Sequence, residues 1–233
     1  RKFFGTLYNT YSFFALYANI DGFDYSEADI ALENRPEIDR WVLSKLNTLV
    51  KDVDEAFETY EPTKAGRLIQ EFVSDQLSNW YVRLSRRRFW KSDDAQDKLS
   101  AYQTLYTCLE TVSVLGSPIA PFFMDQLFSD LNAVTGRNTI ESVHLAEFPK
   151  VNEGLINAEL EEQMNIAQRT CSLVLGLRKK ENIRVRQPLQ KIMVPALDKK
   201  FATNILHVKD LILSELNVKE LELLVEDNSV LVK

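Results

Sequence analysis

Apolar residues recur every three or four positions through most of the chain, which is the spacing of one face of an α-helix. The first such run covers residues 3–18 and ends at Asp21-Gly22. After an irregular stretch to Arg35, a second run begins at Pro36, a residue suited to the first turn of a helix. Its stripe comprises Ile38, Trp41, Val42, Leu46, Leu49, Val53, Ala56, Phe57 and Tyr60. The pattern predicts two long amphipathic helices before residue 61.

Further helical runs are predicted over residues 64–90, 92–115 and 119–131, and from Asn157 onward. The inward stripe of the first of these is Leu68, Phe72, Val73, Leu77, Trp80 and Leu84. The stripe of the last is Leu160, Met164, Ala167, Cys171, Val174 and Leu177. The intervening loop, 135–149, has one predicted extended piece at 142–145.

The pattern changes after Glu181. Strands are predicted at residues 191–195, 218–225 and 229–233, with a turn at 226–228 and a short helix over 203–216. The fold class predicted is mainly α. We expect a helical bundle over residues 1–180, in which 1–35 is a linker segment, followed by a small α/β subdomain over 181–233.

Composition is that of a globular protein, since 45% of the 233 residues are hydrophobic and 27% are charged. The net charge is −6, so any nucleic-acid site must be a local basic patch on an acidic protein. Cys108 and Cys171 lie in apolar surroundings and are predicted to be core residues, which fits a reducing cytoplasm. Neither a membrane-spanning run nor a signal peptide is found, and the chain opens in mid-pattern at Arg1, as a piece of a longer protein would.

One basic cluster lies at the end of the predicted helix 64–90. The sequence NWYVRLSRRRFWK (79–91) contains four arginines, a lysine and four aromatic residues. At about 100° per residue, several of these face away from the apolar stripe. Guanidinium groups bind phosphates, and an aromatic ring can stack on an unpaired base. The candidate RNA-binding residues are Arg83, Arg86, Arg87, Arg88, Trp90 and Lys91.

A second cluster follows the predicted helix that begins at Asn157. Its candidate RNA-binding residues are Arg178, Lys179, Lys180, Arg184 and Arg186. For both clusters the alternative is a solvated helix end, where cations complement the helix dipole.

Catalytic and metal-binding signatures are missing from the sequence. The seven glycines are too far apart for a phosphate-binding loop, and the only histidines, His144 and His207, have no second ligand at metal spacing. No catalytic residue and no metal ligand are therefore predicted.

Six segments resemble the isoleucyl-tRNA synthetase family, which belongs to the class I aminoacyl-tRNA synthetases. They are DRWVLSKLN (39–47), LSNWYVRLSRRRFW (77–90), SPIAPFFMDQLF (117–128), SVHLAEFP (142–149), RKKENIRVRQPL (178–189) and ELNVKELEL (215–223). The opening YNTYSFFALYANIDGF (8–23) resembles the family's link from catalytic core to bundle. The triple arginine with Phe89-Trp90, and VRQPL at 185–189, favour the isoleucine enzymes over the valine and leucine enzymes.

The resemblance implies a cytoplasmic isoleucine–tRNA ligase, of which this chain is the anticodon-binding region. The full-length enzyme would use ATP and Mg²⁺ to activate isoleucine and would transfer it to tRNA(Ile). The family's HIGH and KMSKS signatures are missing here, so we expect a non-catalytic fragment with no cofactor of its own. Its expected partners are tRNA(Ile) and the catalytic and editing domains of the same monomeric chain. The alternatives are a valyl- or leucyl-tRNA synthetase, or a helical scaffold that binds a protein partner and no RNA.

Overall fold

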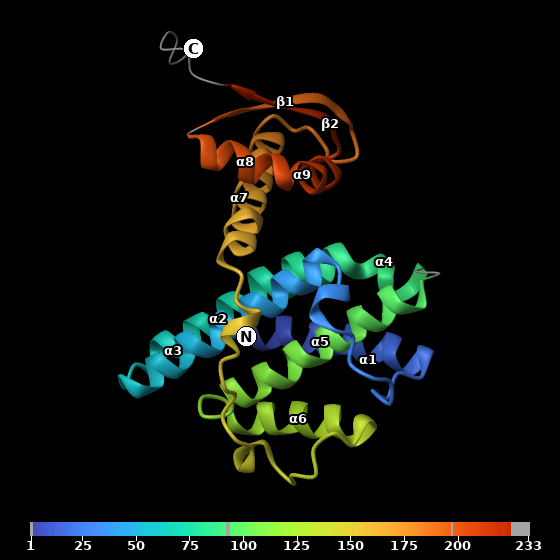
Figure 1. The fold of residues 1–233 in the computed structure, drawn as a ribbon, viewed down its shortest axis with the longest axis vertical. Helices are drawn as coiled ribbons and strands as arrows, with labels where there is room; N and C mark the ends of the chain where they lie inside the picture. The colour runs from blue at the N-terminus through green and yellow to red at the C-terminus, as the bar shows by residue number, and fades with distance from the viewer. Residues whose placement is uncertain (1, 92–93, 197, 225–233) are drawn as a thin grey trace. The chain divides into compact units, whose positions relative to one another are not determined.

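The structure is a computed structural model that describes residues 2–91, 94–196 and 198–224. The predicted mainly α fold with a small α/β end is confirmed (Figure 1). The chain forms two compact units, Arg1–Asn157 and Ala158–Lys233. This division lies one helix before the boundary expected at residue 180, because the helix over Ala158–Lys180 packs against the two helices that follow it.

The first unit is a bundle of helices. Its α-helices are α1 (Lys2–Asp21), α2 (Glu37–Glu58), α3 (Pro62–Glu71), α4 (Arg83–Lys91), α5 (Ala95–Gly116) and α6 (Pro121–Thr135). A π-helical segment, η2 (Phe72–Val82), connects α3 to α4 without a break. The 3-10 turns are η1 (Leu32–Asn34), η3 (Val143–Leu145) and η4 (Glu153–Leu155). In Figure 1 α5 and α6 lie side by side, as their packing contacts also indicate.

Local residues explain where these helices begin and end. Gly22 has a φ of 70°, a left-handed conformation that glycine adopts without strain, and α1 ends just before it. The side chain of Asp94 accepts hydrogen bonds from the main-chain N–H groups of Gln96 (2.9 Å) and Asp97 (3.1 Å), which caps α5. Gly136, with a φ of 58°, closes α6. Since α2 begins at Glu37 and α5 at Ala95, the predicted helix starts near Pro36 and Ser92 are confirmed within a few residues.

The centre of the first unit is α5, which is buried along most of its length. Gly116 near its end leaves room for Met124 of α6, since a Cβ at this glycine would lie 2.5 Å from the Met124 Cε. Arg35 ties the irregular stretch before α2 to α5 through a hydrogen bond from its Nη1 to the Thr104 hydroxyl at 2.7 Å. Cys108 is buried and free, as predicted.

The predicted helix over residues 64–90 is confirmed as one helical segment, but its buried face shifts. A π-helix places hydrogen bonds five residues apart, so each turn contains more residues than an α-helical turn. Trp80 is buried as predicted, at 5% exposure, whereas Leu84 is only half-buried. Tyr81 and Phe89 are fully buried. The η2 segment therefore decides which residues of α4 face outward.

Two further predictions in the first unit are wrong. Tyr60, predicted as the last residue of the apolar stripe of α2, is 92% exposed. It lies past the end of the helix with a φ of 58°, so its side chain turns away from the stripe. The piece expected to be extended at 142–145 is a 3-10 turn. The Ser142 side chain caps this turn by accepting a hydrogen bond from the His144 N–H at 3.3 Å.

The second unit is a small α/β arrangement. Its elements are α7 (Ala158–Lys180), β1 (Leu189–Pro195), α8 (Lys199–His207), α9 (Lys209–Leu216) and β2 (Val218–Leu224). The two strands are parallel, with Ile192 opposite Leu221, and α8 and α9 form the crossover between them. The single helix expected over 203–216 is instead two helices that meet at Val208. The strand predicted at 229–233 lies outside the described residues.

The helix α7 buries the first part of its predicted stripe. Leu160, Met164, Ala167 and Cys171 are buried. Toward the C-terminal end of the helix the prediction is wrong, since Leu177 is 61% exposed and the neighbouring Arg178 is buried at 3% exposure. In the described ranges no helix has both the length and the apolar character that crossing a bilayer requires.

Candidate nucleic-acid interface

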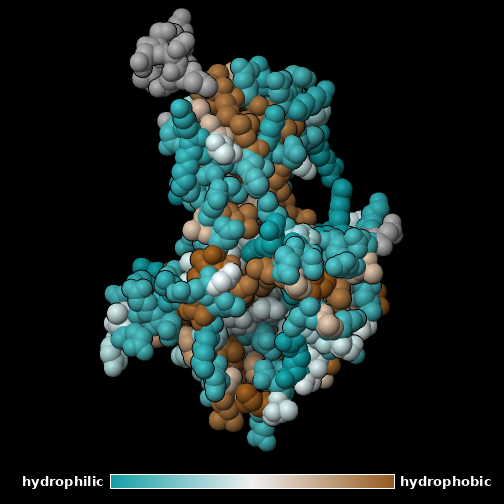
Figure 2. Space-filling view, in the orientation of Figure 1, coloured by the Kyte–Doolittle hydropathy of each residue, from teal (hydrophilic) through white to brown (hydrophobic). Residues whose placement is uncertain are grey.

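The outer face of α4 carries most of the first basic cluster. Arg83, Arg86, Arg87 and Trp90 follow a spacing of three, one and three residues, so they lie on one side of the helix. All four are exposed, and Trp90 is 59% exposed. Lys91 is exposed as well. We call these five residues the α4 face. Figure 2 shows a hydrophilic surface over α3 and α4.

Aromatic rings support two arginines of the α4 face. The guanidinium carbon of Arg83 lies 5.6 Å from the centre of the Trp80 ring, and its Nε donates to the Asn79 carbonyl at 2.7 Å. The guanidinium carbon of Arg86 lies 5.9 Å from the centre of the Phe13 ring. Such cation–π contacts restrict the side chain while leaving the charge on the surface. The face therefore presents cations beside an exposed indole.

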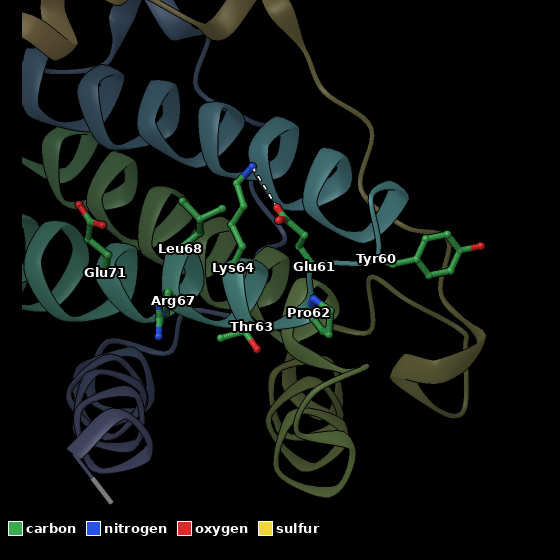
Figure 3. A pocket seen from close by; sticks show the side chains of 8 residues that line it. All are labelled: Tyr60, Glu61, Pro62, Thr63, Lys64, Arg67, Leu68 and Glu71. Carbon is green, nitrogen blue, oxygen red and sulfur yellow. Dashed lines mark ion pairs between the residues drawn. The ribbon is translucent and has the colours of Figure 1, made fainter.

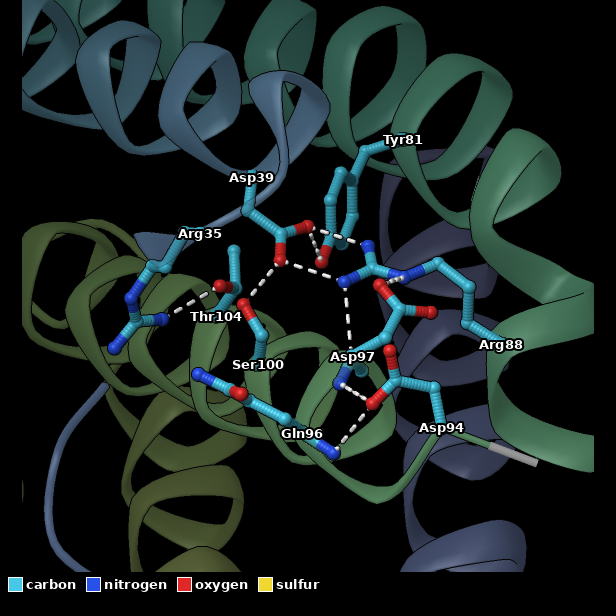
Figure 4. Close-up of polar contacts among 9 residues, drawn as sticks. All are labelled: Arg35, Asp39, Tyr81, Arg88, Asp94, Gln96, Asp97, Ser100 and Thr104. Atoms are coloured by element: carbon cyan, nitrogen blue, oxygen red, sulfur yellow. Dashed lines mark hydrogen bonds and ion pairs between the residues drawn. The ribbon is translucent and has the colours of Figure 1, made fainter. Parts of the chain in front are cut away.

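Arg88 belongs to the same sequence cluster but faces the interior (Figure 4). Its Nη1 and Nη2 donate to the two carboxylate oxygens of Asp39, at 2.6 and 2.7 Å. Its Nε donates to the Asp97 carboxylate at 2.9 Å, and its Nη2 also donates to the Asp97 carbonyl at 2.9 Å. The side chain is 14% exposed. Arg88 thus ties α4 to α2 and α5, and its prediction as an RNA-binding residue is corrected to a structural one.

The carboxylate of Asp39 is fully buried and is the centre of this network. Besides Arg88, the hydroxyl groups of Tyr81 and Ser100 donate to it, at 2.8 and 2.5 Å. Burial and, secondarily, the charge of Asp39 raise the pKa of Tyr81 well above its ordinary value, so the tyrosine stays a donor. A buried carboxylate needs such partners because desolvation of an unpaired charge is costly.

The second cluster lies at the end of α7 and in the loop that follows it. Lys179, Lys180, Arg184 and Arg186 are exposed. Arg178 is buried, and its four hydrogen-bond acceptors are all main-chain carbonyl oxygens. The prediction that Arg178 contacts RNA is therefore corrected, for the same reason as for Arg88. Each cluster has one arginine directed inward and several basic residues directed outward.

A shallow groove at the turn between α2 and α3 is a further surface feature of the first unit (Figure 3). Lys64 and Arg67 line it, but so do Glu61 and Glu71, and Lys64 pairs with Glu61 at 3.6 Å. The exposed Tyr60 points away from the helix in Figure 3. The acidic side chains reduce the attraction of this groove for phosphate, so we do not include it in the interface.

Sequence patterns do not identify two residues that hold the clusters in place: Asp39, and Asn217, whose Nδ2 donates to the carbonyls of Val185 and Arg186 in the second cluster. Asp39 was unremarkable as an acid in a first helical turn, although a carboxylate between the apolar residues Ile38 and Trp41 is a signal of a buried charge. Asn217 follows α9 with a φ of 51°, and an asparagine just after an amphipathic run is typical of a helix end. Among the described residues, no group of three His, Cys, Asp or Glu side chains is placed to hold a metal ion.

Comparison with known proteins shows which family this chain resembles. A family described as "Anticodon-binding domain of tRNA ligase" matches residues 39–193. The isoleucine–tRNA ligase of Bacteroides fragilis is 64% identical over all 233 residues, and that of Bacteroides thetaiotaomicron is 61% identical over the same length. The isoleucine–tRNA ligase of Dehalococcoides mccartyi strain CBDB1 is 47% identical over 95% of this chain.

The chain spans only 20 to 22% of the length of these relatives. The matched family region begins at the buried Asp39 and includes both basic clusters. The resemblance expected from the sequence is confirmed.

Proposed function

Because this chain belongs to the family of anticodon-binding domains of tRNA ligases, we propose that it docks the anticodon stem-loop of tRNA(Ile) for an isoleucine–tRNA ligase. The observation that carries the proposal is the α4 face, with four exposed cations beside one exposed indole. Phosphates attract guanidinium and ammonium groups, and the splayed bases of a loop stack on aromatic side chains.

The proposed roles follow from the chemical group that each side chain presents to solvent. Arg83, Arg86, Arg87 and Lys91 contact phosphates and fix the position of the RNA, while Trp90 stacks on an unpaired base. The exposed residues of the second cluster, Lys179, Lys180, Arg184 and Arg186, add phosphate contacts.

The full-length enzyme, in this proposal, is a cytoplasmic monomer that activates isoleucine with ATP and Mg²⁺ and transfers it to tRNA(Ile). We assign none of the described residues to ATP, Mg²⁺ or the transfer step. Small apolar amino acids are discriminated weakly by binding alone, so the choice of tRNA through its anticodon is a separate task. This chain performs that second task.

The proposal is tested by measuring the dissociation constant for tRNA(Ile) at several salt concentrations. Arg86→Gln should weaken binding and reduce the slope of log K against log salt by about one, since one phosphate contact is lost. Trp90→Ala should weaken binding by about 1–3 kcal/mol with little change of slope. Arg67→Gln is the matched control, because Arg67 is also exposed but lies in the groove with mixed charge.

Wild-type affinity in both Arg86→Gln and Trp90→Ala would contradict the proposal for the α4 face. Binding that does not weaken with salt would contradict RNA docking altogether and favour an apolar protein partner.

A further inference from the structure

The loop 182–188, between α7 and β1, is held by two side chains. Arg178 Nη1 donates to the carbonyl oxygens of Arg184 (3.1 Å) and Gln187 (3.0 Å). Asn217 Nδ2 donates to those of Val185 (2.9 Å) and Arg186 (3.2 Å). Four consecutive carbonyl groups of the loop are therefore engaged by the two donors.

The same two residues are anchored to the rest of the second unit. Arg178 Nη2 donates to the carbonyls of Leu216 (2.8 Å) and Asn217 (3.3 Å) at the end of α9. The Asn217 carbonyl also accepts the N–H of Leu189, at the start of β1, at 3.1 Å. A cation at a helix C-terminus complements the negative end of the helix dipole. The loop is thus attached to α7, α9 and β1 at once.

This attachment determines what the loop presents to solvent. Its carbonyl oxygens, which would repel a phosphate, are turned toward Arg178 and Asn217. The side chains of Arg184 and Arg186 are exposed. Donors that are fixed before binding lose less conformational freedom when the ligand arrives, so a rigid loop binds more tightly than a mobile loop with the same charges.

We infer that Arg178 and Asn217 are positioning residues that fix loop 182–188, with its carbonyls inward and Arg184 and Arg186 outward, as a preformed site for RNA phosphates. Neither positioning residue itself touches the RNA. The inference rests on the proposed function, because it names how the second basic cluster is organised for RNA binding.

The conformation of Asn217 offers a clean test. Its φ of 51° is one that glycine adopts without strain, so Asn217→Gly keeps the end of α9 and removes only the two hydrogen bonds from the side chain to the loop. Asn182 has a φ of 56° at the end of α7 and is exposed. Asn182→Gly is therefore the matched control, the same substitution in the same backbone conformation without those hydrogen bonds.

Three quantities should be measured in the intact protein for both variants and for Arg184→Gln/Arg186→Gln. They are the dissociation constant for tRNA(Ile) against salt, the hydrogen exchange of the amides of residues 183–187, and the melting temperature. Asn217→Gly should speed exchange of the loop amides and weaken binding about tenfold, since each freed residue regains conformational entropy. Its salt slope should move toward that of the double variant, with little change of melting temperature. Asn182→Gly should change binding and exchange much less than Asn217→Gly, because the hydrogen bonds to the carbonyls of residues 184–187 remain.

The outcomes separate the inference from the proposed function. If the double variant loses affinity but Asn217→Gly binds as wild type with the same salt slope, the positioning role is wrong and the RNA contacts stand. If the double variant also binds as wild type, the RNA contact at this loop is wrong, and the inference is overturned with it. Loss of affinity together with unfolding of the β1–β2 pair would also overturn it, since Asn217 would then support the fold and not the loop.

Discussion

The inward arginines of the two basic clusters are stabilised in different ways. Arg88 is paired with the carboxylates of Asp39 and Asp97, which come from α2 and α5. Arg178 is held by main-chain carbonyl groups of the following loop and of the end of α9. The first arginine joins three helices, whereas the second fixes the conformation of a loop.

This difference shows which part of each cluster depends on its buried arginine. In the first unit the exposed cations lie on the α4 helix, whose own hydrogen bonds fix their spacing, so Arg88 sets the place of the helix within the bundle. In the second unit two of the exposed cations, Arg184 and Arg186, lie on a loop without regular structure. Removing Arg178 should therefore disturb the loop more than the fold, and removing the partner of Arg88 should do the reverse.

The largest effect expected is that of Asp39→Ala. The substitution leaves the guanidinium of Arg88 without its main partner in a site where the side chain is only 14% exposed. Breaking a buried ion pair in this way lowers the free energy of unfolding by about 3–5 kcal/mol. Urea denaturation followed by tryptophan fluorescence measures it, because Trp41, Trp80 and Trp90 all belong to the first unit.

A loss of less than about 1 kcal/mol in Asp39→Ala, the range of an exposed pair, would show that the network does not hold the bundle together. Lys64→Ala is the control for an exposed ion pair, since Lys64 pairs with Glu61 at 50% and 55% side-chain exposure.

Arg178→Met should cost less stability. The methionine keeps much of the apolar stem, and the carbonyls of the exposed loop can bind water once the guanidinium is gone. The carbonyl of the buried Leu216, at the end of α9, loses its guanidinium donor, and an unsatisfied buried acceptor costs about 1–3 kcal/mol. Thermal unfolding combined with hydrogen exchange of the β1 and β2 amides measures it. If Arg178→Met lowered the free energy of unfolding as much as Asp39→Ala, the claim that Arg178 supports the loop more than the fold would be wrong.

Alkaline pH should weaken the network around Asp39. Burial raises the pKa of Tyr81 above its ordinary value of 10.0, so above that pH the tyrosine ionises more readily in the unfolded chain than in the folded one. Its stabilising contribution is complete below pH 10 and falls as the pH rises toward the folded-state pKa. Tyr81→Phe should lessen this loss between pH 10 and about 11, as followed by urea denaturation. An unchanged pH profile in Tyr81→Phe would exclude Tyr81 as its source.

The smallest effect on stability is expected on the α4 face. Arg86→Glu should change the free energy of unfolding by no more than about 0.5 kcal/mol, because the side chain is exposed. The same urea titrations measure it. A loss several times larger would mean that its contact with Phe13 supports the packing of α1 against the bundle.

Helical periodicity predicted most of the architecture, since it depends on local spacing that tertiary packing did not override. In the first unit it failed where the chain departs from α-helical geometry. The π-helical segment η2 turned Arg88 inward, and the helix end at Tyr60 left an aromatic side chain in solvent. Neither the π-helical segment nor the helix end before Tyr60 leaves a mark in the spacing of apolar residues, so the apolar pattern alone does not reveal them.

The candidate site was predicted only as two clusters of charge. Which arginine turns inward depends on partners that are distant in sequence. Arg88 and Asp39 are 49 residues apart, and Arg178 and Leu216 are 38 residues apart. A run of like charges carries no information about these partners. The sequence therefore identified where positive charge gathers, and the structure separates the residues that hold each cluster from those that face solvent.

Adjacent arginines on α4 provide the most direct test of this separation. Arg87→Gln and Arg88→Gln make the same change one residue apart, at an exposed and a buried position. For both variants the dissociation constant for tRNA(Ile) and the free energy of unfolding are measured under conditions in which each is fully folded. We predict that Arg87→Gln weakens tRNA binding and leaves stability unchanged, while Arg88→Gln lowers stability by several kcal/mol, about 3–5, and binds almost as wild type. The opposite pattern, or equal loss of binding in both, would contradict the division of each cluster into an inward anchor and an outward RNA-binding face.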